Sequence, residues 1–155
     1  MIDLLVANYN NGKFLEAFFE SIISSTLQPN KIIFVDDCST DNSLEVVENY
    51  ISQGRINIQL IKNEKNAGFA NSLNTAINNI TSPYFARLDP DDYVSADRFK
   101  KQLDTLTNNK EIDVLGSNCT YVMDGQVIKN SNVNSDRAAV EKEIRNGILP
   151  VIHGT

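Results

Sequence analysis

Short apolar runs alternate with amphipathic helical patterns along most of this chain. The apolar runs lie at residues 2–7, 32–35, 56–61 and 84–88, and a helical pattern follows each of them. Parallel strands joined by right-handed helical crossovers produce this alternation, and helices then cover both faces of the sheet. We therefore expect an α/β fold with a mostly parallel sheet.

The pattern becomes less regular after the fourth expected helix. Residues 114–122 are expected to form an irregular fifth strand, and residues 123–127 favour a turn between two strands. Residues 135–145 are polar and moderately helical, and residues 148–152 favour another strand. The length suits one domain, which we expect to span residues 1–155.

The charge balance limits the classes of partner. The formal net charge is -6, which argues against nucleic acid as the main partner because phosphate backbones bind basic surfaces. A small anionic ligand is still compatible with this charge, provided that a metal ion or backbone N–H groups help locally to bind it.

The two cysteines, Cys38 and Cys119, are far apart and fit no metal-binding spacing. The sequence starts without a basic, apolar secretory leader. Two reduced thiols in a cytoplasmic protein are therefore expected rather than a disulfide.

Polar clusters follow all four of the regular expected strands. Tyr9 follows the first strand, Asp36 and Asp37 end the second, and residues 63–68 and 89–92 follow the third and fourth. In parallel sheets, ligands bind beyond the carboxyl ends of the strands. We therefore predict that these clusters meet at one edge of the sheet and form a binding site.

The acidic cluster after the fourth strand is the hardest to explain by local structure. Helix capping accounts for one aspartate, but not for Asp89, Asp91 and Asp92 together. Carboxylates that share a site raise one another's pKa unless a positive group lies between them. Hard oxygen ligands suit Mg²⁺ or Mn²⁺, which would attract phosphate. Arg87 is expected to pair with these acids or to lie near the phosphates.

The other clusters have simpler alternatives. Tyr9 offers an aromatic face for stacking on a base, although an ordinary turn would also explain its surroundings. One of the acids Asp36 and Asp37 could accept a hydrogen bond from a base or ribose while the other fixes the loop. Residues 39–41 favour helix capping. His153, after residues 148–152, is as well explained by a surface position as by a site at the same edge.

Taken together, these residues resemble the family 2 glycosyltransferases, which are inverting enzymes with the GT-A fold, a Rossmann-like sheet flanked by helices. The resemblance extends over essentially the whole chain. The matching segments are residues 6–10, 34–41, 66–68, 86–92, 97–102 and 150–153.

The resemblance implies a role for each matching segment. Tyr9 would stack on the nucleotide base, often uracil, near the backbone of Ala7. Asp37 would hydrogen-bond the base edge, Asp36 would support the loop, and residues 66–68 would line the nucleotide pocket. The substrate-binding candidates are Ala7, Tyr9, Asp36, Asp37, Asn66, Gly68, Arg87, Asp89, Asp91 and His153.

The acidic cluster resembles the Asp-x-Asp motif of this family, which contacts the ribose and the Mn²⁺ or Mg²⁺ that bridges the donor diphosphate. Asp91 and Asp92 are the candidate metal ligands. The acids at 89, 91 and 92 permit two registers of the motif, and the sequence does not separate them.

The resemblance implies metal-dependent transfer with inversion from a nucleotide-diphosphate sugar, with a UDP-sugar favoured, to a glycan or lipid-linked acceptor. Surface polysaccharide biosynthesis, in the cytoplasm and at the inner face of the membrane, is typical of such enzymes. Their catalytic base is an Asp or Glu downstream of the segment that contains His153, and no residue here matches it. We therefore expect a donor-binding portion of a longer enzyme, without the acceptor side.

Other functions fit less well. A non-catalytic nucleotide-sugar-binding domain is compatible with the missing base. A metal-dependent nucleotidyltransferase would need a glycine-rich basic loop after the first strand, which residues 10–13 match poorly. A phosphoryl-receiver module would need an acceptor aspartate after the third strand and a lysine after the fifth, and neither is convincingly present.

Overall fold

A computed structural model describes residues 1–123 and 125–131 of the chain. The chain divides into two compact units, Met1–Asp113 and Val114–Thr155. His153 and the elements expected between residues 135 and 152 lie outside the described residues.

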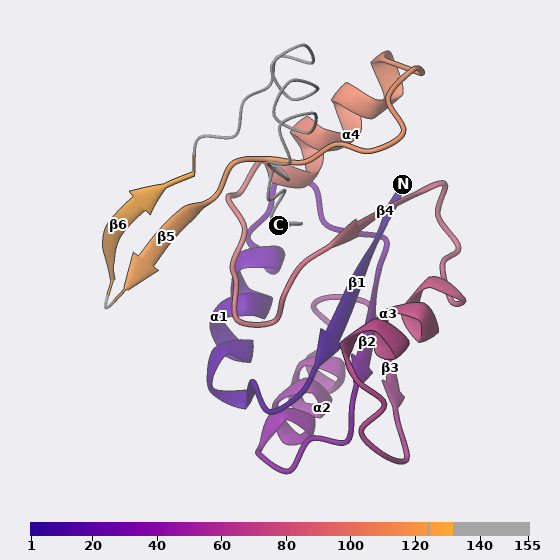
Figure 1. Ribbon diagram of the computed structural model, residues 1–155, viewed down its shortest axis with the longest axis vertical. Helices are drawn as coiled ribbons and strands as arrows, with labels where there is room; N and C mark the ends of the chain where they lie inside the picture. Colours follow the sequence, from indigo (N-terminus) through magenta and orange to yellow (C-terminus); the bar gives the residue numbers. More distant parts are fainter. Residues whose placement is uncertain (124, 132–155) are drawn as a thin grey trace, which may run out of the picture. The chain divides into compact units, whose positions relative to one another are not determined.

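The first unit alternates four strands with four helices, as the sequence predicts (Figure 1). Its elements are β1 (Ile2–Asn8), α1 (Gly12–Ile23), β2 (Lys31–Asp36), α2 (Ser43–Gln53), β3 (Ile58–Lys62), α3 (Phe69–Ile77), β4 (Tyr84–Arg87) and α4 (Arg98–Asn108). The strands pair in the order β3-β2-β1-β4, and all three pairs are parallel. The α/β class and the parallel sheet are therefore confirmed.

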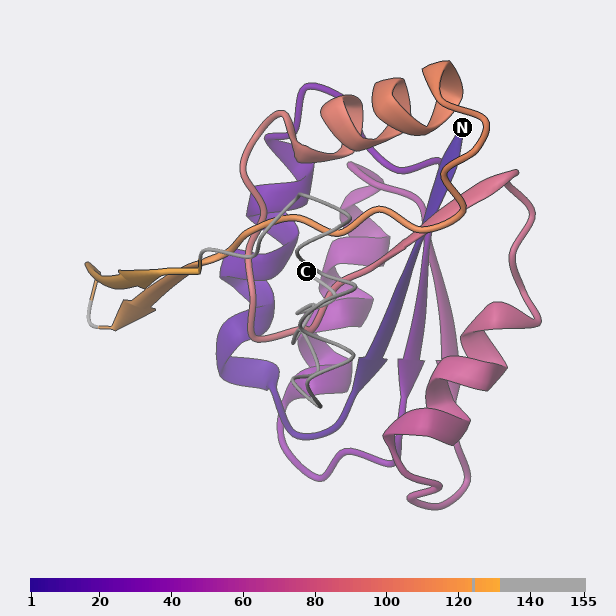
Figure 2. The same ribbon diagram turned by 45° about the horizontal axis from the view of Figure 1, so that its top comes forward.

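Helices cover both faces of this sheet. In Figure 2, α1 and α2 lie on one face and α3 lies on the other. Residues of β1 and β2 alternate between the two faces, so that Leu4 and Ile32 face α1 and α2 while Leu5 and Ile33 face α3. Burial of both faces explains why β1 is a continuous apolar run.

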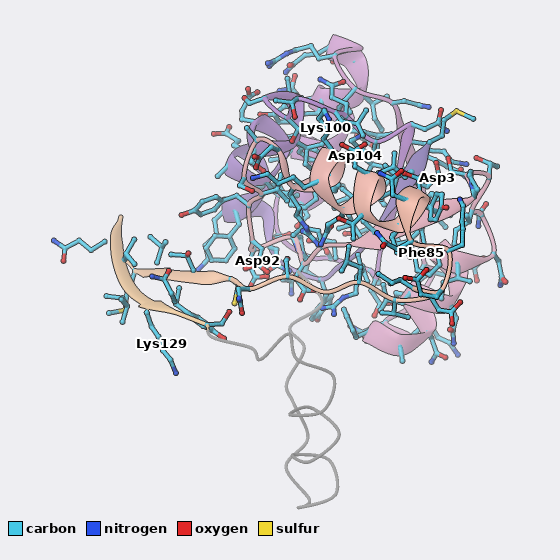
Figure 3. The ribbon with its side chains drawn as sticks, turned by 90° about the horizontal axis from the view of Figure 1, so that it is seen from above. Asp3, Phe85, Asp92, Lys100, Asp104 and Lys129 are labelled. Carbon is cyan, nitrogen blue, oxygen red and sulfur yellow. The ribbon has the colours of Figure 1, made fainter. Side chains whose placement is uncertain are left out.

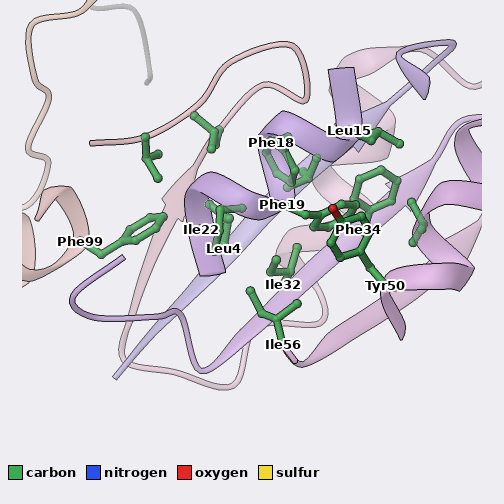
Figure 4. Close-up of a cluster of buried hydrophobic side chains, with 14 of the residues drawn as sticks. Leu4, Leu15, Phe18, Phe19, Ile22, Ile32, Phe34, Tyr50, Ile56 and Phe99 are labelled. Carbon is green, nitrogen blue, oxygen red and sulfur yellow. The ribbon is translucent and has the colours of Figure 1, made fainter. Parts of the chain in front are cut away.

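The larger core lies between the sheet and helices α1, α2 and α4 (Figure 4). Its rings include Phe18, Phe19 and Phe34, and Phe19 and Tyr50 lie 4.6 Å apart between ring centroids. Helix α4 contributes Phe99 to the same cluster. Phe14 of α1 is 38% exposed and lies outside this cluster.

The amino edge of the sheet, where the strands begin, is held by Asp3 of β1. This carboxylate is fully buried and accepts five hydrogen bonds, from Thr81, Ser82 and Asn30. Burial raises the pKa of Asp3, but these hydrogen bonds outweigh it and hold the pKa far below its usual value. Asp3 thereby ties the segments that enter β2 and β4 to β1.

The second unit contains an antiparallel hairpin of β5 (Thr120–Met123) and β6 (Gln126–Asn130). The predicted turn between two strands is confirmed. The predicted start of a strand at Val114 is wrong: residues 114–119 form no strand, and Val114 is 83% exposed. Two adjacent apolar residues are too short a run to specify a strand without a neighbouring strand to pair with.

No helix within the described ranges is long and apolar enough to cross a membrane.

Candidate functional site

A pocket of about 610 Å³ opens at the carboxyl edge of the sheet, where the strands end. Such a volume is within the range of small-molecule sites. Its walls come from the ends of β1, β2 and β4 and from the start of α3. The lining residues are Ala7, Asn8, Tyr9, Asn11, Asp37, Asn66, Gly68, Phe69, Ser72, Arg87, Asp89, Pro90 and Asp91.

The structure thus brings together most of the residues singled out in the sequence. The pocket is lined by eight of them, Ala7, Tyr9, Asp37, Asn66, Gly68, Arg87, Asp89 and Asp91. Asp36 and Asp92 do not line it, and His153 lies outside the described residues.

Asp36 is buried behind the pocket and joins two loops. It accepts hydrogen bonds from Asn8 Nδ2 at 2.9 Å and from the Ser39 backbone N–H and hydroxyl at 2.9 and 2.6 Å. Ser39 in turn accepts a hydrogen bond from the backbone N–H of Asn10. These contacts fit the role of loop support, because the carboxylate is turned toward the chain and is 1% exposed.

Asp37 holds the loop that leads into α3. Its oxygens accept hydrogen bonds from the backbone N–H groups of Ala67 and Gly68, both at 2.8 Å, and from Asn63 Nδ2 at 2.7 Å. Burial raises the pKa of Asp37, but these hydrogen bonds and one from Ser72 lower it overall. Both of its oxygens are therefore already engaged by the chain, although Asp37 lines the pocket.

Gly68 precedes α3 with a φ of +86°, a conformation that L side chains rarely adopt. A Cβ at this position would meet no atom within 4 Å. Backbone conformation, rather than lack of space, therefore explains this glycine.

Asp41 links the loops that follow β1 and β2. Its carboxylate accepts hydrogen bonds from the backbone N–H of Ser43 at 2.9 Å and of Gly12 at 2.8 Å, at the beginnings of α2 and α1. Asp41 thus accepts hydrogen bonds from the first N–H groups of two helices, but the N-cap residue of α2 is Asn42, one residue after the segment 39–41 that was expected to cap it. Burial raises the pKa of Asp41, but the bonds from Ser43 and Gly12 lower it, as expected for a carboxylate at helix N-termini.

Two aromatic rings line the pocket with large exposed areas. Tyr9 is 48% exposed and Phe69 is 51% exposed. The guanidinium of Arg87 lies over the Phe69 ring at 5.1 Å from its centroid. An exposed aromatic surface inside a polar pocket suits a flat heteroaromatic ligand such as a nucleobase.

The three carboxylates of the acidic loop after β4 have different partners and different exposure. Asp89 forms an ion pair with Arg87, and its carbonyl accepts the backbone N–H of Asp92 at 3.1 Å. Asp91 is exposed and lines the pocket, and within the described ranges it has no ion-pair or hydrogen-bond partner for its carboxylate. Asp92 is half-buried and interacts electrostatically with Arg98.

The donor set of this loop fits a hard divalent cation. Asp89 and Asp91 offer carboxylate oxygens to the same pocket. No three Asp, Glu, His or Cys side chains among the described residues are grouped as a complete metal site. Mg²⁺ and similar ions are commonly held by one or two carboxylates together with substrate phosphates and water. The loop therefore suits a cation that arrives with a diphosphate.

Five lining residues were not among the candidates: Asn8 and Pro90, which lie inside the segments singled out in the sequence, and Asn11, Phe69 and Ser72, which lie outside them. Phe69 directly follows Gly68, and Ser72 lies one helical turn after Gly68, so the opening of α3 at the pocket was the available signal. Asn11 precedes α1 in the loop after Tyr9.

Residues 3–154 match the family model described as glycosyl transferase family 2. The chain belongs to this family. Membership agrees with the GT-A type of sheet and with the position of the pocket at its carboxyl edge.

Curated relatives of this family 2 chain carry glycosyltransferase names. An uncharacterized glycosyltransferase of Haemophilus influenzae is 34% identical over 117 residues, which cover 76% of this chain and 36% of the relative. The processive diacylglycerol beta-glycosyltransferase of Mycoplasma pneumoniae is 32% identical over 120 residues, which cover 76% of this chain and 35% of the relative. The family 2 chain thus spans about a third of the length of these relatives.

Solved glycosyltransferases share the fold. The structure of S. aureus TarS in complex with UDP-GlcNAc is 25% identical in sequence, with a TM-score of 0.64. The similarity covers 69% of this family 2 chain and 31% of the TarS chain.

Proposed function

We propose that the pocket at the carboxyl edge binds a nucleoside-diphosphate sugar together with Mn²⁺ or Mg²⁺. The chain then supplies the donor side of a sugar transfer that proceeds with inversion. The observation that carries this proposal is the convergence of an exposed aromatic ring, Tyr9, and two carboxylates, Asp89 and Asp91, on one pocket.

The base end of the donor is assigned to the wall formed by Tyr9 and the Asp37 loop. The Tyr9 ring provides the stacking surface. Because both oxygens of Asp37 already accept hydrogen bonds from the chain, Asp37 shapes the pocket through the backbone of Ala67 and Gly68. TarS, which shares this fold, binds UDP-GlcNAc, and this supports a uridine nucleotide as the first candidate.

The diphosphate end is assigned to the acidic loop. Asp91 is the proposed metal ligand, and Asp89, released from Arg87, contacts the ribose or the metal. A bound cation would offset the charge that develops on the departing nucleoside diphosphate. Arg87 is then free to approach a phosphate oxygen, which its planar guanidinium suits.

The proposed acceptor is a hydroxyl group of a glycan or a lipid-linked sugar. The name of the Mycoplasma pneumoniae relative states a diacylglycerol substrate, which supports a lipid acceptor. We propose a role in surface polysaccharide assembly at the cytoplasmic face of a membrane. The catalytic base and the acceptor side are assigned to further chain of the kind found in the longer relatives.

Isothermal titration calorimetry with UDP and GDP, each with Mn²⁺ and with EDTA, tests the donor site. We expect Mn²⁺ to raise the affinity of one nucleotide at least about a hundredfold, as for direct metal–phosphate contacts. Asp91→Asn should abolish this increase and leave the thermal midpoint unchanged, because its carboxylate has no described partner.

Asp104→Asn is the matched control, since Asp104 is an exposed carboxylate on α4 that pairs only with Lys100 in the described unit. It should bind like the wild type. Equal affinity with Mn²⁺ and with EDTA, or an Asp91→Asn variant that binds normally, would contradict the metal site.

A further inference from the structure

Arg98 occupies an unfavourable position for a cation. It is the first residue of α4, where the positive end of the helix dipole disfavours positive charge. Burial lowers the pKa of Arg98, Asp92 raises it and the neighbouring Arg87 lowers it, and together they bring the pKa of Arg98 down to about 10. A partly buried arginine at a helix N-terminus needs compensating contacts, and one of them is to the end of β4, directly before the acidic loop.

The contacts of the Arg98 guanidinium reach the end of β4. Its Nη2 donates to the carbonyl oxygen of Arg87 at 3.2 Å, two residues before Asp89. Its Nε donates to Gln102 Oε1 at 3.2 Å, one turn further along α4. The adjacent Phe99 is fully buried in the main core. Arg98 thus connects the last residue of β4 to a helix anchored in the core.

The far side of the loop adds an electrostatic contact. Asp92 is the acid of the cluster that does not line the pocket, and its charge favours the protonated Arg98. The backbone N–H of Asp92 closes a turn onto the carbonyl of Asp89. This turn couples the position of Asp92 to that of Asp89, which lines the pocket.

Two arginines therefore interact with two of the three carboxylates. Arg87 pairs with Asp89 inside the pocket, and Arg98 interacts with Asp92 outside it. Asp91 is the remaining acid and is exposed to the pocket.

We propose that Arg98 is a positioning residue for the donor site: it holds the Arg87 carbonyl and Asp92, and so presents Asp89 and Asp91 to the metal and diphosphate. The inference rests on the proposed nucleotide-sugar site. It adds Arg98, a residue of α4 outside the pocket, which affects metal-dependent binding through the position of the acidic loop.

The test is the Mn²⁺-dependent part of UDP or GDP affinity, whichever nucleotide binds the wild type more tightly. Arg98→Met and Asp92→Asn should each reduce this part at least about tenfold, as is typical for residues behind metal ligands. Metal-free nucleotide binding should stay within about twofold, because Tyr9 and the Asp37 loop do not depend on Arg98. A defect that is only structural would weaken both kinds of binding.

The double variant Asp92→Asn/Arg98→Met should lose no more metal-dependent affinity than Arg98→Met alone, because Arg98→Met already removes the interaction with Asp92. Arg98→Lys keeps the charge and should recover most of the metal-dependent affinity. Lys100→Met is the matched control, since it removes a cation from the same helix. Lys100 pairs with Asp104, and Figure 3 places both on α4, apart from Asp92. Additive losses for Asp92 and Arg98 would overturn the proposal.

Amide hydrogen exchange of residues 88–93 separates this inference from the proposed function. Exchange there should be about tenfold faster in Arg98→Met than in Lys100→Met, since the loop loses its anchor. If the wild type binds no nucleotide with Mn²⁺, the donor site is refuted and exchange alone decides whether Arg98 holds the loop. Unchanged exchange in Arg98→Met would refute the positioning role itself.

Discussion

Carboxylates at the two edges of the sheet differ in their burial and in their hydrogen bonding. At the amino edge, Asp3 is fully buried and accepts five hydrogen bonds from the chain. At the carboxyl edge, Asp91 is exposed to the pocket without a described partner. Asp37 lies between these extremes, since it lines the pocket but is saturated by the loop before α3.

This contrast in hydrogen bonding separates structural from functional acids in this fold. A carboxylate whose oxygens are saturated by the chain stabilises the fold, and its removal leaves buried donors without partners. A carboxylate without partners contributes little to folding and is available to a ligand. Stability and binding should therefore respond to different substitutions at the two edges.

The largest effect is expected from Asp3→Ala. The substitution leaves the N–H groups of Thr81 and Ser82 without their acceptor, and the free energy of unfolding should fall by about 3 kcal/mol or more. Urea denaturation followed by circular dichroism measures it. Asp104→Ala, at an exposed ion pair on α4, should leave the urea midpoint unchanged. Similar urea midpoints for both variants would contradict the claim that the buried carboxylate of Asp3 stabilises the fold more than an exposed one does.

The pH dependence of stability follows from the same carboxylate. The pKa of Asp3 is lowered in the folded state, so its stabilisation is complete above the unfolded-state pKa of about 3.9 and is lost as the pH falls further. Wild-type urea midpoints should therefore decrease steeply between about pH 4 and pH 2. Asp3→Asn, less stable at neutral pH, should show a shallower decrease. Parallel curves would mean that Asp3 does not control acid unfolding.

At the carboxyl edge, the exposed ring of Tyr9 should affect binding but hardly affect stability. Tyr9→Ala should weaken UDP binding by about 1–2 kcal/mol, equally with Mn²⁺ and with EDTA, because stacking does not involve the metal. Tyr9 is half-exposed, so the thermal midpoint should hardly change. Phe14→Ala on α1 is the control, since this aromatic residue is also partly exposed but does not line the pocket. A loss confined to the Mn²⁺ titration would contradict stacking.

The sequence predicted the alternating elements well, because buried strands and amphipathic helices leave distinct periodicities. It also predicted that the polar clusters share one edge, since parallel strands all end on the same side. The strand order β3-β2-β1-β4 was not predicted, because the neighbours of a strand are set by crossovers rather than by its own residues. The same limit explains the wrong strand at Val114.

Within the site, residue types could be predicted from the sequence, but the directions of the side chains could not. The sequence alone does not distinguish Asp89, Asp91 and Asp92. In the structure they differ through the turn from Asp89 to Asp92 and through the location of Arg98. Asp36 and Asp37 are likewise adjacent acids. The structure turns Asp36 toward Asn8 and Ser39, and Asp37 toward the loop before α3.

The bond pattern of Asp41 has a consequence for recognition. Because one side chain joins the first residues of α1 and α2, the segments that carry Tyr9 and Asp37 are fastened to each other before any ligand arrives. Such preorganisation reduces the entropy lost on association. A ligand would bind to an aromatic wall that is already formed. Rearrangement on binding would be concentrated in the acidic turn, where Asp89 must leave Arg87 for a new partner.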